Sequence, residues 1–208
     1  NQNKRALVVG NPEMPETFIG ANQTIPLSLG SLPGAEEEAQ AIAQLLGTKA
    51  IIGKDATEAA ISKQMGSAQL IHLATHGLIQ DFSGSGVPGA IALASSGEQD
   101  GILTSDEILK LDLQAELVVL SACDTGRGHL TGDGVIGLSR SILAAGASSL
   151  VVPLWAVNDE ASANLMVEFY RQQRQSKAQA LRQAMLSTME EYPHPIEWGA
   201  FTMIGQAN

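Results

Sequence analysis

The stretch ELVVLSACDTGRG, residues 116–128, decides the fold of this chain. Apolar and small residues lead to Cys123, the single cysteine, and the sequence then breaks at once into Asp, Thr, Gly, Arg and Gly. This pattern predicts a fully buried strand that ends at a surface loop. A lone thiol at such a point is either a small buried hydrophobe or a nucleophile at the carboxyl end of a parallel sheet, where α/β folds place their sites.

Length and composition limit the class of protein. The 208 residues predict a single domain, and the net charge of −10, without any cluster of Lys and Arg, argues against a nucleic-acid partner. One cysteine excludes internal disulfides and predicts a reducing, cytoplasmic location. No apolar run approaches the roughly 18–20 residues of a membrane span, so no membrane partner is expected. Because the chain opens on a strand-like run and not on Met, we expect residues 1–208 to be one domain excised from a longer protein.

Strands and helices are predicted to alternate along the chain. We expect strands at 6–10, 49–53, 70–75, 116–122, 149–155 and 198–204, a hairpin of 90–94 with 101–103, and helices at 35–46, 57–66, 106–110, 135–145, 159–172 and 178–189. Residues 13–34 and 80–89 are expected to be surface loops. This order predicts a mainly parallel sheet covered by helices on both faces.

A second strand ends in a reactive side chain. LIHLATHG, residues 70–77, places His76 at the strand end, 47 residues before Cys123. If the two strands are neighbours, both side chains lie at the same sheet edge, where an imidazole can make the thiolate accessible. A histidine about 50 residues upstream of the nucleophile is also the caspase arrangement, although here only the Ala-Cys core of that cysteine motif is present.

Three segments, HLATHG (72–77), LSACDTGRG (120–128) and GDGVIGLSRSILAAGASSLVVPLWAVND (132–159), resemble the CHAT domain family. The resemblance extends over about residues 6–205. It implies a caspase-like three-layer sandwich of the cysteine-peptidase clan that includes caspases and separases. It also implies a cysteine endopeptidase that acts on a protein or peptide substrate. As partner it implies a region of tetratricopeptide repeats in the same chain, or a regulatory protein.

The resemblance assigns roles to individual residues. His76 would be the general base, and Cys123 would be the nucleophile that forms a thioester. The backbone N–H groups of Gly77 and Cys123 would form the oxyanion hole, where a glycine allows close approach. The end of WAVND resembles a separase segment, and Asp159 would bind Arg or Lys before the cleaved bond. Asp159 also stands where a helix N-cap belongs, in competition with Asn158, so both roles remain open.

Other polar residues have simpler interpretations. Asp124 and Asp133 are weaker candidates for the same substrate pocket, since both also suit turns. Residues 36–38, three glutamates, read as the solvated first turn of a helix. Among the histidines, His72 is expected in the core, His129 in the loop after the nucleophile and His194 in a turn between prolines.

No metal or cofactor is predicted. No histidine pair has the spacing of a zinc site, and Asp81, Asp100 and Asp106 do not form a calcium loop. The glycines at 132, 134 and 137 match a nucleotide-binding spacing but do not directly follow a strand. Two alternatives to a peptidase therefore stay open: a non-catalytic or partner-activated interaction module of the same fold and, less favoured, a nucleotide-binding domain.

Overall fold

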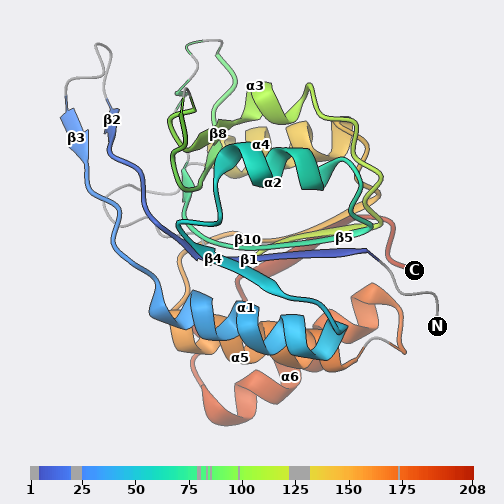
Figure 1. The fold of residues 1–208 in the computed structure, drawn as a ribbon. Helices are drawn as coiled ribbons and strands as arrows, with labels where there is room; N and C mark the ends of the chain where they lie inside the picture. The colour runs from blue at the N-terminus through green and yellow to red at the C-terminus, as the bar shows by residue number, and fades with distance from the viewer. Residues whose placement is uncertain are drawn as a thin grey trace.

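A computed structural model describes residues 5–19, 25–78, 81, 82, 84, 86–97, 99–121, 132–172 and 174–208, with the side chains of 17–19, 25, 27 and 132–135 excepted. The fold is a three-layer α/β sandwich (Figure 1). The main sheet has six strands in the order β11-β10-β9-β5-β1-β4. These are β1 (Ala6–Pro12), β4 (Ala50–Gly53), β5 (Leu70–Ala74), β9 (Leu117–Leu120), β10 (Ser149–Pro153) and β11 (Phe201–Gly205). All neighbours pair in parallel except β11, which is antiparallel to β10.

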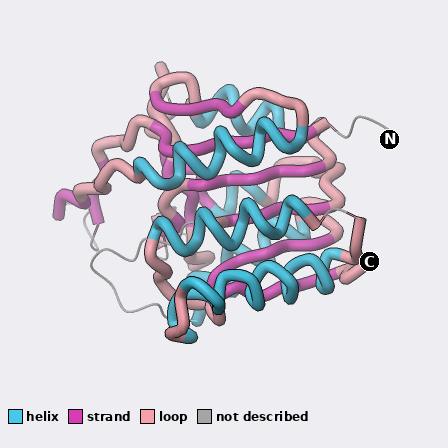
Figure 2. Tube along the Cα trace, turned by 90° about the horizontal axis from the view of Figure 1, so that it is seen from below, coloured by secondary structure: helices cyan, strands magenta, loops and turns pink. Residues whose placement is uncertain are grey.

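Helices cover both faces of this sheet, as the alternating sequence predicts. One face carries α2 (Glu58–Met65), α3 (Ser105–Ile108) and α4 (Gly132–Ala144), and the other carries α1 (Pro33–Leu46), α5 (Asp159–Arg171) and α6 (Lys177–Glu191). Figure 2 views the second layer from below, with its long helices running along the strands. Local signals fix the helix starts, for example the Thr57 hydroxyl that accepts the N–H of Ala60 at the start of α2.

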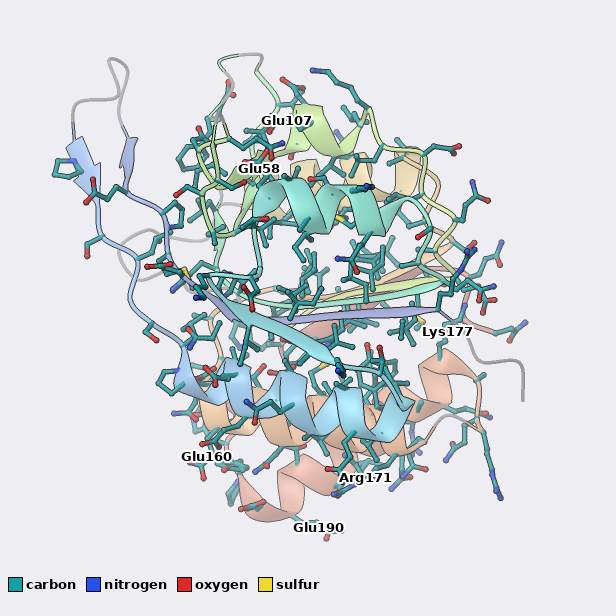
Figure 3. All side chains as sticks on the ribbon, viewed as in Figure 1. Glu58, Glu107, Glu160, Arg171, Lys177 and Glu190 are labelled. Carbon is teal, nitrogen blue, oxygen red and sulfur yellow. The ribbon has the colours of Figure 1, made fainter. Side chains whose placement is uncertain are left out.

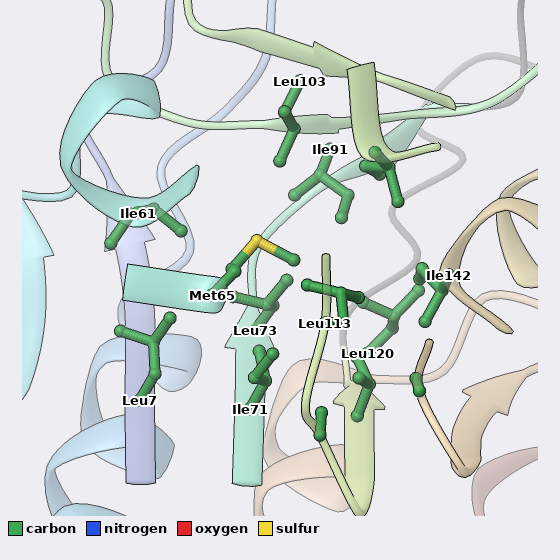
Figure 4. Packing of buried hydrophobic residues seen from close by; sticks show 14 of the residues in the cluster. Leu7, Ile61, Met65, Ile71, Leu73, Ile91, Leu103, Leu113, Leu120 and Ile142 are labelled. Atoms are coloured by element: carbon green, nitrogen blue, oxygen red, sulfur yellow. The ribbon is translucent and has the colours of Figure 1, made fainter. Parts of the chain in front are cut away.

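Two hydrophobic cores lie against the two faces of the sheet. In β9, Val118 and Leu120 join the core under α2–α4, whereas Leu117 and Val119 join the core under α1, α5 and α6. The same alternation runs through β1 and β10, which explains why these strands read as continuous apolar runs. Figure 4 shows part of the first core, in which aliphatic side chains from both layers interlock: Leu7, Ile61, Met65, Ile71, Leu73, Ile91, Leu103, Leu113, Leu120 and Ile142. Aliphatic residues thus build this first core, whereas the second core also contains the buried aromatic residues Phe169, Tyr170 and Phe201.

Short elements depart from the prediction. Residues 13–34 are not one long loop, because β2 (Thr17–Ile19) and β3 (Ile25–Leu27) pair as a hairpin and α1 begins within this range. The expected hairpin of β7 (Ala90–Ala92) with β8 (Ile102–Thr104) is present and gains β6 (Gly77–Leu78) as a third strand. A short helix, α7 (Pro195–Trp198), precedes β11. Elements of two to four residues have too few positions for a period to appear in the sequence.

Among the described residues, no helix combines the length and the apolarity needed to cross a bilayer.

Candidate functional site

The strands that end before His76 and before Cys123 are neighbours. β5 and β9 pair in parallel, with Leu70 opposite Leu117 and Leu73 opposite Leu120, which is a constant offset of 47 residues. Beyond the strand, the N–H of Ser121 donates to the carbonyl of Leu73 over 3.1 Å. The two strands are therefore adjacent, as the predicted site requires. The segments that follow them leave the sheet at the same edge.

His76 lies two residues after the end of β5 and is fully buried, with 0% of its surface exposed. Its Nε2 atom lies 2.6 Å from the carbonyl oxygen of Gly30, in the segment that joins β3 to α1. A carbonyl oxygen only accepts hydrogen bonds, so this contact assigns the ring hydrogen to Nε2. In the neutral ring Nδ1 is then the basic nitrogen, and the contact holds the ring in one orientation.

Gly77 follows as the first residue of β6, opposite Ile91 of β7. Next to this pair, the N–H of Ala92 donates to the carbonyl of His76 over 3.0 Å. In an antiparallel ladder, that bond makes Gly77 and Ile91 a non-hydrogen-bonded pair, whose N–H groups point away from each other. The N–H of Gly77 is thus directed away from β7.

The nucleophile candidate lies outside the described residues, as do Asp124 and His129. Asp133 belongs to the backbone of α4, and its side chain is likewise outside the description. Ser121 is the last described residue before Cys123, and its carbonyl accepts the hydroxyl of Ser162 over 2.9 Å. α5 therefore fixes the chain two residues before Cys123.

Asp159 lies in the first turn of α5, but it does not cap that helix. The N-cap is Asn158, whose Oδ1 accepts the N–H groups of Glu160 and Ala161. The Asp159 carboxylate instead reaches the start of α1, where its Oδ2 accepts the N–H of Gly34 over 2.8 Å. This half-buried carboxylate compensates for α1, whose own N-cap residue provides no side-chain hydrogen bond.

Because the carboxylate of Asp159 is half-buried, its charge is not fully exposed to a substrate. Burial raises the pKa of the Asp159 carboxyl, and the negative charge of Glu38 raises it further. The N–H groups of Gly34 and Ala35 and the nearby His76 act in the opposite direction on this pKa. Asp159 is thus electrostatically coupled to His76, and the structure places the two residues in one neighbourhood at the carboxyl edge of the sheet.

His72 is a core residue, as predicted, and it contacts two buried polar side chains. Its Nε2 lies 2.9 Å from Oε1 of Glu38, and its Nδ1 lies 3.3 Å from the hydroxyl of Tyr170. Burial raises the pKa of Tyr170 well above its usual range, so this hydroxyl stays protonated beside Nδ1. The expectation that residues 36–38 form a solvated turn is wrong for Glu38, which is only 2% exposed. A run of three glutamates carries no signal in the sequence that shows which of them faces the core.

The remaining polar candidates have structural roles. His194 caps α7 with its Nδ1, and Asp81 and Asp100 accept backbone N–H groups within their own turns. Within the described parts of the chain, no three His, Cys, Asp or Glu side chains are grouped to hold a metal ion.

Sequence reasoning missed two features of the site. One is the Gly30 carbonyl that contacts His76, and the other is the side chain of Asn11, which accepts hydrogen bonds from Ser31 and Leu32, the residues after Gly30. A backbone acceptor has no residue-type signal, so the Gly30 contact could not be read from the sequence. Asn11 lies directly after the strand expected at residues 6–10. Its signal was an Asn directly after a buried strand, a residue type that tolerates a left-handed backbone and hydrogen-bonds nearby turns.

The fold belongs to the caspase-like class. The structure superposes on the Arg-specific cysteine proteinase gingipain R with a TM-score of 0.58 and 13% identity, covering 99% of this chain and 48% of that one. The match to RgpB in the complex of its pro- and mature domains from Porphyromonas gingivalis is equivalent. Separase, in the Saccharomyces cerevisiae separase–securin complex, gives a TM-score of 0.56 and 15% identity, covering 97% of this chain and 12% of separase. At these identities the likeness concerns the fold alone.

Within this class the chain belongs to the CHAT domain family, whose model matches residues 1–206. It is 31% identical over 235 residues to tetratricopeptide repeat protein 28 of Homo sapiens, and equally identical to the protein of that name from Mus musculus. Each alignment covers 96% of this chain but 9% of the relative, so the chain spans less than a tenth of these curated proteins.

Proposed function

We propose that this chain is a cysteine endopeptidase domain that cleaves peptide bonds with a dyad of His76 and Cys123. The thiolate of Cys123 attacks the peptide carbonyl, and the C–N bond of the tetrahedral intermediate breaks as His76 gives its proton to the leaving amine. Water then hydrolyses the thioester, with His76 accepting the proton of the water. The acid product leaves as the C–S bond breaks, and the proton held by His76 returns to the sulfur of Cys123.

The observation that carries this proposal is the register of β5 and β9. Paired residues of these strands are 47 positions apart, and His76 and Cys123 are also 47 positions apart. Because neighbouring parallel strands leave the sheet at one edge, an equal offset favours the two side chains emerging at the same level. The CHAT family membership and the caspase-like fold support the same dyad.

The hydrogen bond at Nε2 supports a role for His76 as base through Nδ1. With its hydrogen directed at Gly30, the neutral ring takes a proton at Nδ1. The imidazolium that then forms keeps the Gly30 carbonyl as its acceptor. The N–H of Gly77, directed away from β7, supports its assignment to the oxyanion hole together with that of Cys123.

For specificity we propose that Asp159 selects Arg or Lys before the cleaved bond, with Asp124 and Asp133 as further candidates. Gingipain R, one of the structural neighbours, is an Arg-specific cysteine proteinase. The coupling between Asp159 and His76 supports a location near the reacting groups. The hydrogen bond from Gly34 to Asp159 opposes this assignment, because binding a guanidinium would require the carboxylate to share or leave that contact.

Cleavage of a mixed peptide library tests the proposal. Cys123→Ala and His76→Ala should each abolish cleavage while the far-UV spectrum stays native. Full cleavage by the Cys123→Ala variant would overturn the dyad. A library without preference for Arg or Lys would remove Asp159 from the specificity pocket and leave the dyad standing.

The complete burial of His76 favours a second form of this function, in which a partner activates the domain. The curated relatives are named for tetratricopeptide repeats. Such repeats, in the same chain or in another protein of the cytoplasm, are a candidate partner. Iodoacetamide distinguishes the two forms, because the single cysteine makes alkylation specific for Cys123. Fast alkylation of the isolated chain indicates an assembled dyad. Slow alkylation that a partner accelerates indicates activation, and slow alkylation throughout indicates a non-catalytic interaction module.

A further inference from the structure

The Gly30 carbonyl that contacts His76 lies in an irregular segment. Residues 28–32, called here the strap, join β3 to α1 and belong to neither a strand nor a helix. Gly30 itself is exposed, and a Cβ at this position would meet no atom within 4 Å. Local secondary structure and packing around Gly30 therefore do not fix the carbonyl that orients the catalytic ring.

The side chain of Asn11, at the end of β1, holds the strap directly after Gly30. Its Oδ1 accepts the N–H of Leu32 over 2.8 Å and the hydroxyl of Ser31 over 3.1 Å. Its Nδ2 donates to Oε2 of Glu36 over 3.1 Å, in the first turn of α1. One amide thus uses both its acceptor and its donor to connect β1, the strap and α1.

The backbone at Asn11 is unusual in the same place. Asn11 has a φ of 44°, and among the described residues no other non-glycine has a positive φ. The register between β1 and β4 shifts between Gly10 and Pro12, which places the irregularity at Asn11. Bulges and left-handed residues concentrate next to functional sites, where they aim a side chain. The left-handed backbone is compatible with Asn and Asp, and with Gly.

We propose that Asn11 is a positioning residue of the peptidase: it fixes the strap so that the Gly30 carbonyl holds Nε2 of His76. This inference rests on the proposed function for its catalytic consequence. Asn11 does not touch the reacting atoms and acts through Gly30. Loss of its side chain lets the ring rotate away from the geometry that proton transfer requires, and such misplacement lowers turnover more than substrate binding.

Two substitutions separate the side chain from the backbone. Asn11→Gly keeps the left-handed backbone and deletes all three hydrogen bonds. The double variant Asn11→Asp, Glu36→Gln keeps the acceptor for the strap and reverses the direction of the third bond. Thr57→Ala is the matched stability control, because it removes an N-cap bond of α2 on the opposite face of the sheet.

Two measurements decide the proposal in the whole chain. With the best substrate from the peptide library, Asn11→Gly should lower kcat by about tenfold or more and change KM by less than about twofold. The double variant should recover kcat to within about threefold, and Thr57→Ala should lower the unfolding midpoint without this kcat loss. In nitrogen-15 NMR spectra, the Nε2–H signal of His76 should weaken in Asn11→Gly and return in the double variant.

Three results would overturn the positioning role: a native kcat in Asn11→Gly, an equal kcat loss in Thr57→Ala, or an unchanged Nε2–H signal in Asn11→Gly. If the native chain cleaves no peptide, the proposed function fails, and the NMR signal alone decides whether Asn11 positions the ring. The two failures are therefore distinguishable.

Discussion

The carboxylate of Asp159 accepts the backbone N–H of Gly34 over 2.8 Å, so the first turn of α5 holds the first turn of α1. The two residues are 125 positions apart in the chain. This bond joins two helices of one layer at the edge of the sheet where β5 ends, close enough to His76 for their charges to interact. The strap is therefore held on one side by Asn11 and followed on the other by an anchored helix start.

Asp159→Asn should change how stability depends on pH. The pKa of Asp159 is raised above its ordinary value of 3.8 mainly by burial, so the folded protein binds this proton more tightly than the unfolded chain. Its contribution to the free energy of unfolding is then largest below pH 3.8 and falls as the pH rises through the folded pKa. Urea unfolding at several pH values, native minus variant, should show this fall. A difference that grows with pH would contradict the assignment, and the exposed Glu160→Gln is the control.

Gly34→Ala should be destabilising because the new methyl group has no room. A Cβ at Gly34 would collide with the carboxylate of Asp159, so the carboxylate has to leave its hydrogen bond. We expect a loss of about 1–3 kcal/mol in the free energy of unfolding. Gly30→Ala is the matched control in the same region, since its Cβ meets nothing within 4 Å. Equal stability of the two variants by chemical denaturation would show that the close contact is not maintained in solution.

Glu38→Ala should destabilise the protein, whereas Glu37→Ala should not. Glu38 is 2% exposed and contacts His72, so its loss leaves a buried imidazole without that partner. The expected cost is about 1–3 kcal/mol, and the exposed Glu37 should stay within about 0.5 kcal/mol of native. Thermal or urea unfolding of the neighbouring pair measures the difference directly. A small effect at both positions would mean that the buried pair contributes nothing net to stability.

Glu58→Gln should stabilise the protein at neutral pH. Glu58 is 3% exposed and accepts the N–H of Gly101, and burial, followed by the charges of Glu107 and Asp100, raises the pKa of its carboxyl above 4.5. The ionised carboxylate is thus disfavoured in the fold, and a neutral amide keeps the acceptor without the charge. The gain should disappear as the pH falls below 4.5, where the native carboxyl is also protonated. Figure 3 shows Glu58 and Glu107 on one side of the sheet and Glu190, an exposed control position, on the other. A gain of the same size for Glu190→Gln would point to net charge instead.

The sequence was sufficient for the long elements, whereas the adjacency of the strands that precede His76 and Cys123 was only a condition, which the structure meets. Strands such as Leu117–Leu120 are buried on both faces, so they appear as apolar runs, and their order along the chain implies parallel pairing. The identity of the buried glutamate, the partner of Asp159 and the acceptor for His76 were not predictable. Each depends on contacts between segments tens of residues apart, and two of the three involve backbone atoms.

The offset of 47 residues between paired positions of β5 and β9 counts positions along the chain, and it does not measure a separation in space. Residues 77–116 leave the sheet after His76, build the small sheet of β6, β7 and β8 with α3, and return to begin β9 at the opposite edge. Relatives could lengthen or shorten this excursion without changing the pairing of β5 with β9. Alignment of such proteins by the spacing of the two residues would therefore fail, whereas alignment of the two strand ends would succeed.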